Sequence, residues 1–446
     1  MTARIRRILM TAAVASVLTA GGSTGAQSLR RTQSSSPQAT LGVPGAMNST
    51  PALTVAGRSI AAVWTATREG VTNVYLATST DGGATFSEPR RVNDQDGDAS
   101  ANNEQPPRVV MSGSGSARTL TVFWSKRGEG PALNNVEGPQ KTRRDTIRMA
   151  RSTDGGRTFS PARFAHDPAL SGARGWESLA VGAGGQVHAV WLDGRDAERK
   201  MAEEAAHSGT ARKGQPPQDI YHGALAPDGR IIESVIATGV CFCCKTAVAV
   251  DARGTVYAAW RHIFPGSMRD IAFAKSADGG RRFDPLVRVS GDNWELNGCP
   301  EDGPTLAVDQ AGVIHIAWAT VVNAGEPQKA LFYATSRDGK TFSPRARLPV
   351  ADAATPGHPQ LTLTPDGGAA IAWDEVVAGL RRVSFTRVSP SGVFRPSQIL
   401  SGDESASNPV IVRSDRNVLV AWTSRSAAAK PAAEPSMIKL RRLGPT

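Results

Sequence analysis

Residues 304–318 read PTLAVDQAGVIHIAW, which is the clearest copy of a pattern that recurs along the chain. Two short apolar runs flank a turn at Gly312, and the second run ends in Trp318. Runs that alternate with a period of two and are rich in β-branched residues are typical of strands. The stretch therefore predicts two antiparallel strands joined by a tight turn.

The same pattern recurs along most of the chain. Seven of the nine tryptophans end a run of this kind: Trp64, Trp124, Trp191, Trp260, Trp318, Trp373 and Trp422. After each tryptophan come a third apolar run, a turn and a short fourth run, so each unit predicts four antiparallel strands. Four-stranded units repeated at this period are typical of a β-propeller, in which stacked sheets bury one another's faces. We expect the seven tryptophans to fill the space between blades.

The two ends of the chain predict how the ring closes. The last unit, residues 408–443, contains only three predicted strands, and a candidate fourth lies near residues 38–43. We therefore predict an all-β fold, a seven-bladed β-propeller of four-stranded antiparallel blades closed by an N-terminal strand. Six blades is the alternative. Closure would leave no exposed strand edge at the junction.

The turns between the third and fourth strands carry a motif of their own. It occurs at Ser79–Phe86, Ser152–Phe159, Ser276–Phe283 and Ser336–Phe342, each time with an Asp-Gly pair. This motif resembles the Asp-box (BNR) repeat of sialidase-like β-propellers. The resemblance implies that the boxes are structural and lie on the face opposite the active site.

The sialidase resemblance also implies an arginine clamp for a carboxylate and a tyrosine nucleophile. The tyrosines of this chain are Tyr75, Tyr221, Tyr257 and Tyr333, and all lie within or beside predicted strands. The sequence therefore assigns no catalytic residue.

The N-terminus predicts export. Residues 1–26 combine a basic start, an apolar run and a small-residue end, which is the pattern of a cleavable signal peptide. We expect residues 27–446 to form a single Asp-box propeller domain in the periplasm or outside the cell, without a membrane span and as a monomer. The net charge of +11 is scattered without a run of Lys or Arg, so we expect no nucleic-acid partner.

The cysteines are the most distinctive candidates for a site. Cys241, Cys243 and Cys244 precede the first predicted strand of blade four, and Cys299 occupies the same position in blade five. We expect both groups at the mouth of the central channel. Three interpretations remain open: disulfides, which an exported chain with an even cysteine count favours; a soft metal site for copper or zinc; and redox-active thiols.

Further candidates lie at equivalent steps or in neighbouring loops. The predicted ligand-binding residues are Trp176, Glu177, Arg261, Arg269, Asp270, Glu301, Asp302 and His358. We interpret the protein as a binding propeller whose cysteine-bearing channel mouth takes a soft metal, a small molecule or a glycan. The alternatives are a sialidase-like exo-glycosidase with an altered active site and a scaffold braced by disulfides.

Overall fold

The computed structural model describes most of the chain beyond the predicted signal peptide. The described residues are 38–113, 118–128, 145–170, 172–208, 218–226, 229–296, 298, 300, 302–323, 326–427 and 434–444. The signal-peptide prediction, Cys299 and Glu301 lie outside these residues.

The described residues form seven blades, each made of four antiparallel strands. The first four blades comprise β2 (Met47–Ala56), β3 (Ser59–Arg68), β4 (Val71–Ser79), β5 (Arg90–Arg91); β6 (Arg108–Ser112), β7 (Thr119–Lys126), β8 (Thr146–Ser152), β9 (Arg163–Phe164); β10 (Arg174–Val181), β11 (Val187–Asp193), β12 (Gln218–Leu225), β13 (Ile231–Val240); and β14 (Ala247–Val250), β15 (Val256–Phe264), β16 (Met268–Ser276), β17 (Val287–Arg288). The last three comprise β18 (Thr305–Val308), β19 (Ile314–Asn323), β20 (Pro327–Ser336), β21 (Ala346–Arg347); β22 (Thr355–Leu363), β23 (Ala369–Val377), β24 (Leu380–Val388), β25 (Gln398–Ile399); and β26 (Ser405–Ser414), β27 (Asn417–Arg425), β28 (Met437–Leu443), β1 (Gln38–Leu41).

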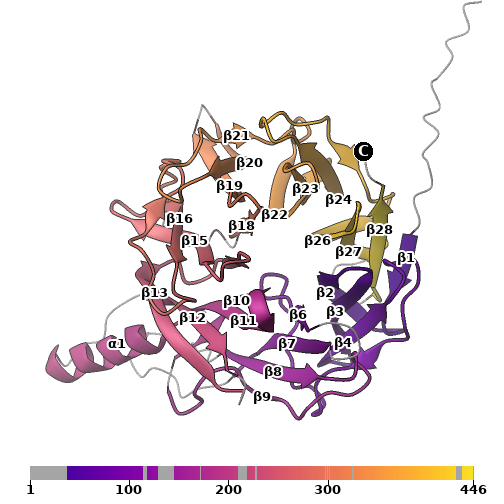
Figure 1. Ribbon diagram of the computed structural model, residues 1–446, viewed down its shortest axis with the longest axis horizontal. Coiled ribbons are helices and arrows are strands. Elements are labelled where there is room, and N and C mark those ends of the chain that lie inside the picture. Colours follow the sequence, from indigo (N-terminus) through magenta and orange to yellow (C-terminus); the bar gives the residue numbers. More distant parts are fainter. Residues whose placement is uncertain are drawn as a thin grey trace, which may run out of the picture. The chain divides into compact units, whose positions relative to one another are not determined.

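The first strands of the blades line the channel of a closed ring. Each inner strand contacts the next, from β2 through β6, β10, β14, β18 and β22 to β26, and β26 contacts β2 again (Figure 1). Five blades are separate four-stranded sheets. Blades three and four share one eight-stranded sheet, but only the pair Val240 and His262 joins β13 to β15. The prediction of a seven-bladed all-β propeller is therefore confirmed.

The N-terminal strand closes the ring as predicted. β1 pairs antiparallel with β28, with Gln38 opposite Arg441 and Leu41 opposite Ile438. It thus supplies the fourth strand of blade seven from the opposite end of the chain.

The seven repeated tryptophans form the core between blades. Each is at most 2% exposed. Trp318 of blade five, for example, packs with Tyr257, Ile271 and Phe273 of blade four. The predicted role of these side chains is confirmed, because each interface needs a bulky residue that reaches the neighbouring sheet.

The Asp-box turns are tightly hydrogen bonded. Asp81 Oδ1 accepts the backbone N–H groups of Ala84 and Thr85 at 2.9 and 3.0 Å, and the Ser79 hydroxyl donates to Oδ1 at 2.8 Å. Gly83 has φ +86°, and a Cβ there would lie 2.5 Å from Leu419 Cδ2. The turn thus needs glycine both for its backbone conformation and for its contact with blade seven.

One helix departs from the all-strand expectation. α1 (Arg195–Ser208) occupies the insertion between β11 and β12, in addition to the short 3₁₀ turn η2 (Ala183–Gly185). Its sequence is rich in Ala, Glu and Arg, which are strong helix formers, and Arg199 pairs with Asp196 and Glu203 on successive turns. The all-β prediction includes no helix at this position, and the structure corrects it. None of the helices in the described part of the chain is long and apolar enough to cross a membrane.

Candidate functional site at the channel mouth

Four inner strands begin with the same backbone irregularity. Thr50, Trp176, His358 and Asn408 all have φ between 52° and 56°, and the register of β2, β10, β22 and β26 shifts at these positions. A bulge of this kind redirects side chains, and such strained non-glycine residues concentrate at functional sites. Two of the four, Trp176 and His358, are predicted ligand-binding residues.

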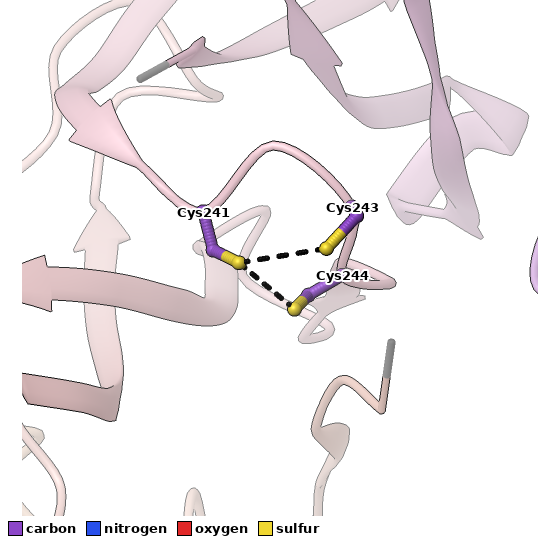
Figure 2. Close-up of side chains that lie close together, drawn as sticks. All are labelled: Cys241, Cys243 and Cys244. Atoms are coloured by element: carbon purple, nitrogen blue, oxygen red, sulfur yellow. Dashed lines mark hydrogen bonds between the residues drawn. The ribbon is translucent and has the colours of Figure 1, made fainter. Parts of the chain in front are cut away.

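The three clustered cysteines follow the end of β13 and precede β14. Their side chains turn toward one another, and the Cys241 sulfur faces those of both Cys243 and Cys244 (Figure 2). The Cys241 sulfur lies 3.2 Å from that of Cys244 and 3.8 Å from that of Cys243. All three are buried, and Trp176, Phe242 and Ile263 pack against them. The sequence expectation that these cysteines form one group is met for these three.

The covalent state differs within the group. Cys241 and Cys244 are free thiols, whereas Cys243 is disulfide-bonded. No disulfide joins two cysteines of the described ranges. The expected convergence of Cys299 with the cluster stays a prediction, because Cys299 lies outside those ranges.

The pKa values of the two free thiols are shifted in opposite directions. A hydrogen bond donated by the Cys244 thiol lowers the pKa of Cys241 to about 6, and the Arg269 and Arg261 guanidiniums add to the effect. Burial raises the pKa of Cys244 well above its usual value. At neutral pH the pair therefore consists of one thiolate and one thiol that donates to it.

Two buried arginines stand beside the thiolate. Arg261 donates from Nε and Nη2 to the carbonyl oxygen of Asp302, at 3.1 and 3.0 Å, and its Nη2 also reaches that of Ala319 at 2.6 Å. Arg269 donates from Nε to the carbonyl oxygen of Leu296 at 3.1 Å. Its Nη1 finds no hydrogen-bond partner among the described residues. The two cations are thus fixed by backbone oxygens and not by carboxylates.

A charged network centred on His358 adjoins the cysteines. His358 Nδ1 lies 2.8 Å from Asp374 Oδ2, and Nε2 lies 2.9 Å from Glu104 Oε1. The other Glu104 oxygen pairs with Lys245 Nζ at 2.9 Å. Glu104, Lys245 and His358 belong to blades two, four and six, which are not neighbours in the ring. These contacts therefore bridge the channel, and we call this group the cross-channel network.

Asp302 and Lys329 complete the cross-channel network. Asp302 Oδ1 accepts the backbone N–H of His358 at 2.9 Å, and Asp302 Oδ2 pairs with Lys329. Burial alone would lower the pKa of His358, but the Asp374 and Asp302 carboxylates outweigh burial and raise it to about 9. For Glu104 burial acts in the other direction and would raise the pKa, but Lys245 and His358 outweigh it and lower the pKa to about 2. At neutral pH the network therefore consists of charged groups that neutralise one another.

Two cavities flank the cross-channel network. One of about 510 Å³ opens between blades seven, one and two, and Asn102, Asn103, Glu104, Arg127 and Arg425 line it together with Met47, Ser49, Thr67 and Ala101. The other, of about 200 Å³, lies in the channel and is lined by residues of all seven inner strands.

Of the remaining predicted ligand-binding residues, Asp270 has side-chain partners, whereas neither carboxylate oxygen of the buried Glu177 has a hydrogen-bond partner among the described residues. Burial raises the pKa of Glu177, whose backbone oxygen accepts Arg108 Nε at 2.9 Å. Asp270 pairs with Arg288 Nε at 2.8 Å and accepts the backbone N–H of Asn293 at 3.1 Å. Asp270 thus anchors the connection between blades four and five. Glu301 lies outside the described residues.

Sequence reasoning did not include Lys245, Lys329 or Asp374 in the site. Lys245 directly follows Cys244, and Asp374 directly follows the repeated Trp373. These positions next to Cys244 and Trp373 were the only features of the sequence that could have drawn attention to Lys245 and Asp374. Their significance depends on contacts between remote blades, which no local pattern displays.

Comparisons with known proteins bear on the fold. No family model and no curated protein matches this sequence. Among solved structures, a PL25 ulvan lyase bound to -[GlcA(1-4)Rha3S]- is 12% identical over 91% of this chain and 94% of its own, with a TM-score of 0.55. A protein of unknown function from Dyadobacter fermentans is 12% identical over 92% of this chain and 98% of its own, with a TM-score of 0.53.

A Hadza microbial sialidase is 15% identical over 86% of this chain and 76% of its own, at a TM-score of 0.44. The similarity to the lyase, at 12% identity, concerns the fold alone. The chain thus shares its β-propeller fold with a polysaccharide lyase.

Proposed function

We propose that this protein is an exported propeller that binds one soft monovalent metal ion, Cu(I), through Cys241 and Cys244. The observation that carries the proposal is the pair of buried free thiols, 3.2 Å apart, next to two buried arginines. The export rests on the predicted signal peptide.

The ligand set favours Cu(I) over Zn(II). In the described part of the chain, the group of potential metal ligands at this position contains the three cysteines and no histidine or carboxylate. Zn(II) takes four ligands in structural sites. Thiolates select Cu(I), for which two of them are a sufficient ligand set. Cys243 is not needed for this coordination.

The charge balance points the same way. Two thiolates and one Cu(I) ion leave a net charge of −1 in a buried site. Burying an uncompensated charge is costly, and a nearby opposite charge is required. That charge comes from Arg261 and Arg269, which are each at most 6% exposed. Both donate to backbone carbonyl oxygens and not to carboxylates, so their positive charges are left for the site.

A competition titration tests the proposal. Cu(I) is added anaerobically to the full chain in the presence of a chromophoric Cu(I) chelator, with and without Zn(II). We expect one Cu(I) per chain, and a loss of affinity of at least about 100-fold in Cys241→Ser and Cys244→Ser, because each removes one of two ligands. Phe242→Leu, in the same segment, is the matched control and should retain binding. Equal binding by all four proteins would contradict the proposal.

A second candidate function rests on the larger cavity. Its lining is polar and partly cationic and includes Glu104, which contacts the protonated His358. The cavity thus has a carboxylate and a candidate general acid on the same side. The ulvan lyase of similar fold was solved with an acidic oligosaccharide. We therefore keep an exo-glycosidase acting on an acidic sugar as the alternative. A panel of fluorogenic glycosides that includes a sialoside tests it, and Glu104→Gln should abolish any turnover found.

A further inference from the structure

Trp176 is placed differently from the repeated tryptophans. It lies in the inner strand β10, at the bulge, with φ +56°. Its side chain packs against the cysteine cluster. Since bulky residues rarely adopt this backbone conformation, the surrounding structure must hold Trp176 in place.

Thr246 links the backbone of Trp176 to the segment that carries the thiols. The backbone N–H and the hydroxyl of Thr246 both donate to the carbonyl oxygen of Trp176, at 3.2 and 2.8 Å. Thr246 is two residues after Cys244. The position of the indole relative to the thiols is therefore fixed across the boundary between blades three and four.

The indole N–H of Trp176 does not explain this placement. Nε1 is buried and has no hydrogen-bond partner among the described residues. By contrast, the Nε1 atoms of Trp64, Trp191 and Trp318 donate to side-chain oxygens at 2.9, 2.9 and 2.7 Å. The contact between Trp176 and the cluster is therefore apolar packing.

We infer that Trp176 is the cap of the metal site, an indole that binds a soft monovalent cation held by Cys241 and Cys244 and shields it from water. The inference rests on the proposed function and names a further specificity-determining residue. An aromatic ring attracts a cation within about 6 Å of its centroid, and indole does so best. The attraction strengthens in a desolvated site, and this cluster is buried. A site of two thiolates closed by an apolar ring has no further ligands to offer, so it favours Cu(I) or Ag(I) over Zn(II), which takes four ligands in structural sites.

Ag(I) is the probe, because it shares the charge and thiol preference of Cu(I) and is not oxidised by air. Ag(I) is titrated into the wild-type chain and into Trp176→Phe, Trp176→Leu and Trp294→Phe while tryptophan emission and affinity are recorded. Trp294 is the matched control, since it is the other tryptophan outside the repeat and stacks on Arg261 at 5.1 Å.

We expect quenching that saturates at one Ag(I) per chain in the wild type and in Trp294→Phe. In Trp176→Phe the quenching is lost but binding persists, and in Trp176→Leu the affinity falls about tenfold. Full quenching and unchanged affinity in both Trp176 variants would overturn the cap and leave the metal site standing. Absence of Ag(I) binding to the wild type would overturn both.

A second measurement covers the case in which the Trp176 variants fold poorly. The ultraviolet difference spectrum of the wild-type chain should show an indole band shift that saturates with the first Ag(I). The same spectrum of Cys244→Ser should stay flat. A flat wild-type spectrum despite binding of one Ag(I) would again refute the cap.

Discussion

Replacing His358 by glutamine should remove a pH-dependent part of the stability. The imidazole is 17% exposed and lies between Asp374 and Glu104. Its pKa rises from 6.5 in the unfolded chain to about 9 in the folded one. A group whose pKa is raised by folding stabilises the protein below the unfolded value and loses that effect as pH rises through the folded value.

The magnitude follows from the shift. One pKa unit corresponds to 1.36 kcal/mol, so this shift is worth about 3 kcal/mol, and nearly all of it is lost between pH 6 and pH 10. Cys241 works in the opposite direction, since its lowered pKa adds stability as pH rises through about 6. The difference between wild type and His358→Gln cancels this second contribution, because both chains contain Cys241.

The assay is urea unfolding, followed by tryptophan fluorescence, at intervals between pH 6 and pH 10. The wild type should exceed His358→Gln in unfolding free energy by about 3 kcal/mol more at pH 6 than at pH 10. His207→Gln, on the exposed part of α1, is the control and should follow the wild type. Parallel wild-type and His358→Gln curves across this range would refute the cross-channel network as a charged assembly.

Three further outcomes follow from the fold and the cluster. Thiol labelling of the urea-unfolded chain without reductant should modify two cysteines, Cys241 and Cys244, and four after reduction; labelling of four before reduction would contradict the assigned disulfide state. Trp318→Ala should lower the unfolding free energy by about 3–5 kcal/mol, because it opens a cavity between blades four and five. Trp318→Phe loses chiefly the hydrogen bond from the indole to Asp292, so the same denaturation assay should show a loss of about 1–3 kcal/mol. A chain that begins at residue 45 lacks β1 and exposes the edge of β28, so size-exclusion chromatography should detect self-association; a stable monomer would argue against closure by this strand.

The propeller could be predicted because its evidence is local and repeated. Each strand pair ending in tryptophan reads the same way, and the missing strand of the last unit pointed to the N-terminus. The helix α1 was missed because its residues lie in a polar insertion, where the repeat gives no information.

The site could be predicted only in part. Cys241, Cys243 and Cys244 are conspicuous in a chain with four cysteines, and their place before an inner strand set them at the channel mouth. The contact between Glu104 and His358 spans 254 positions in sequence and depends on the diameter of the closed ring. The bulges that orient Trp176 and His358 likewise depend on register, which the sequence pattern does not reveal.

Binding of Cu(I) by Cys241 and Cys244 is tested most directly by X-ray absorption at the copper edge on the chain loaded with one equivalent of Cu(I). A dithiolate site should give a first shell of two sulfur atoms, and this shell should be lost in Cys244→Ser. A first shell of nitrogen or oxygen, or an unchanged sulfur shell in that variant, would contradict a dithiolate site at Cys241 and Cys244.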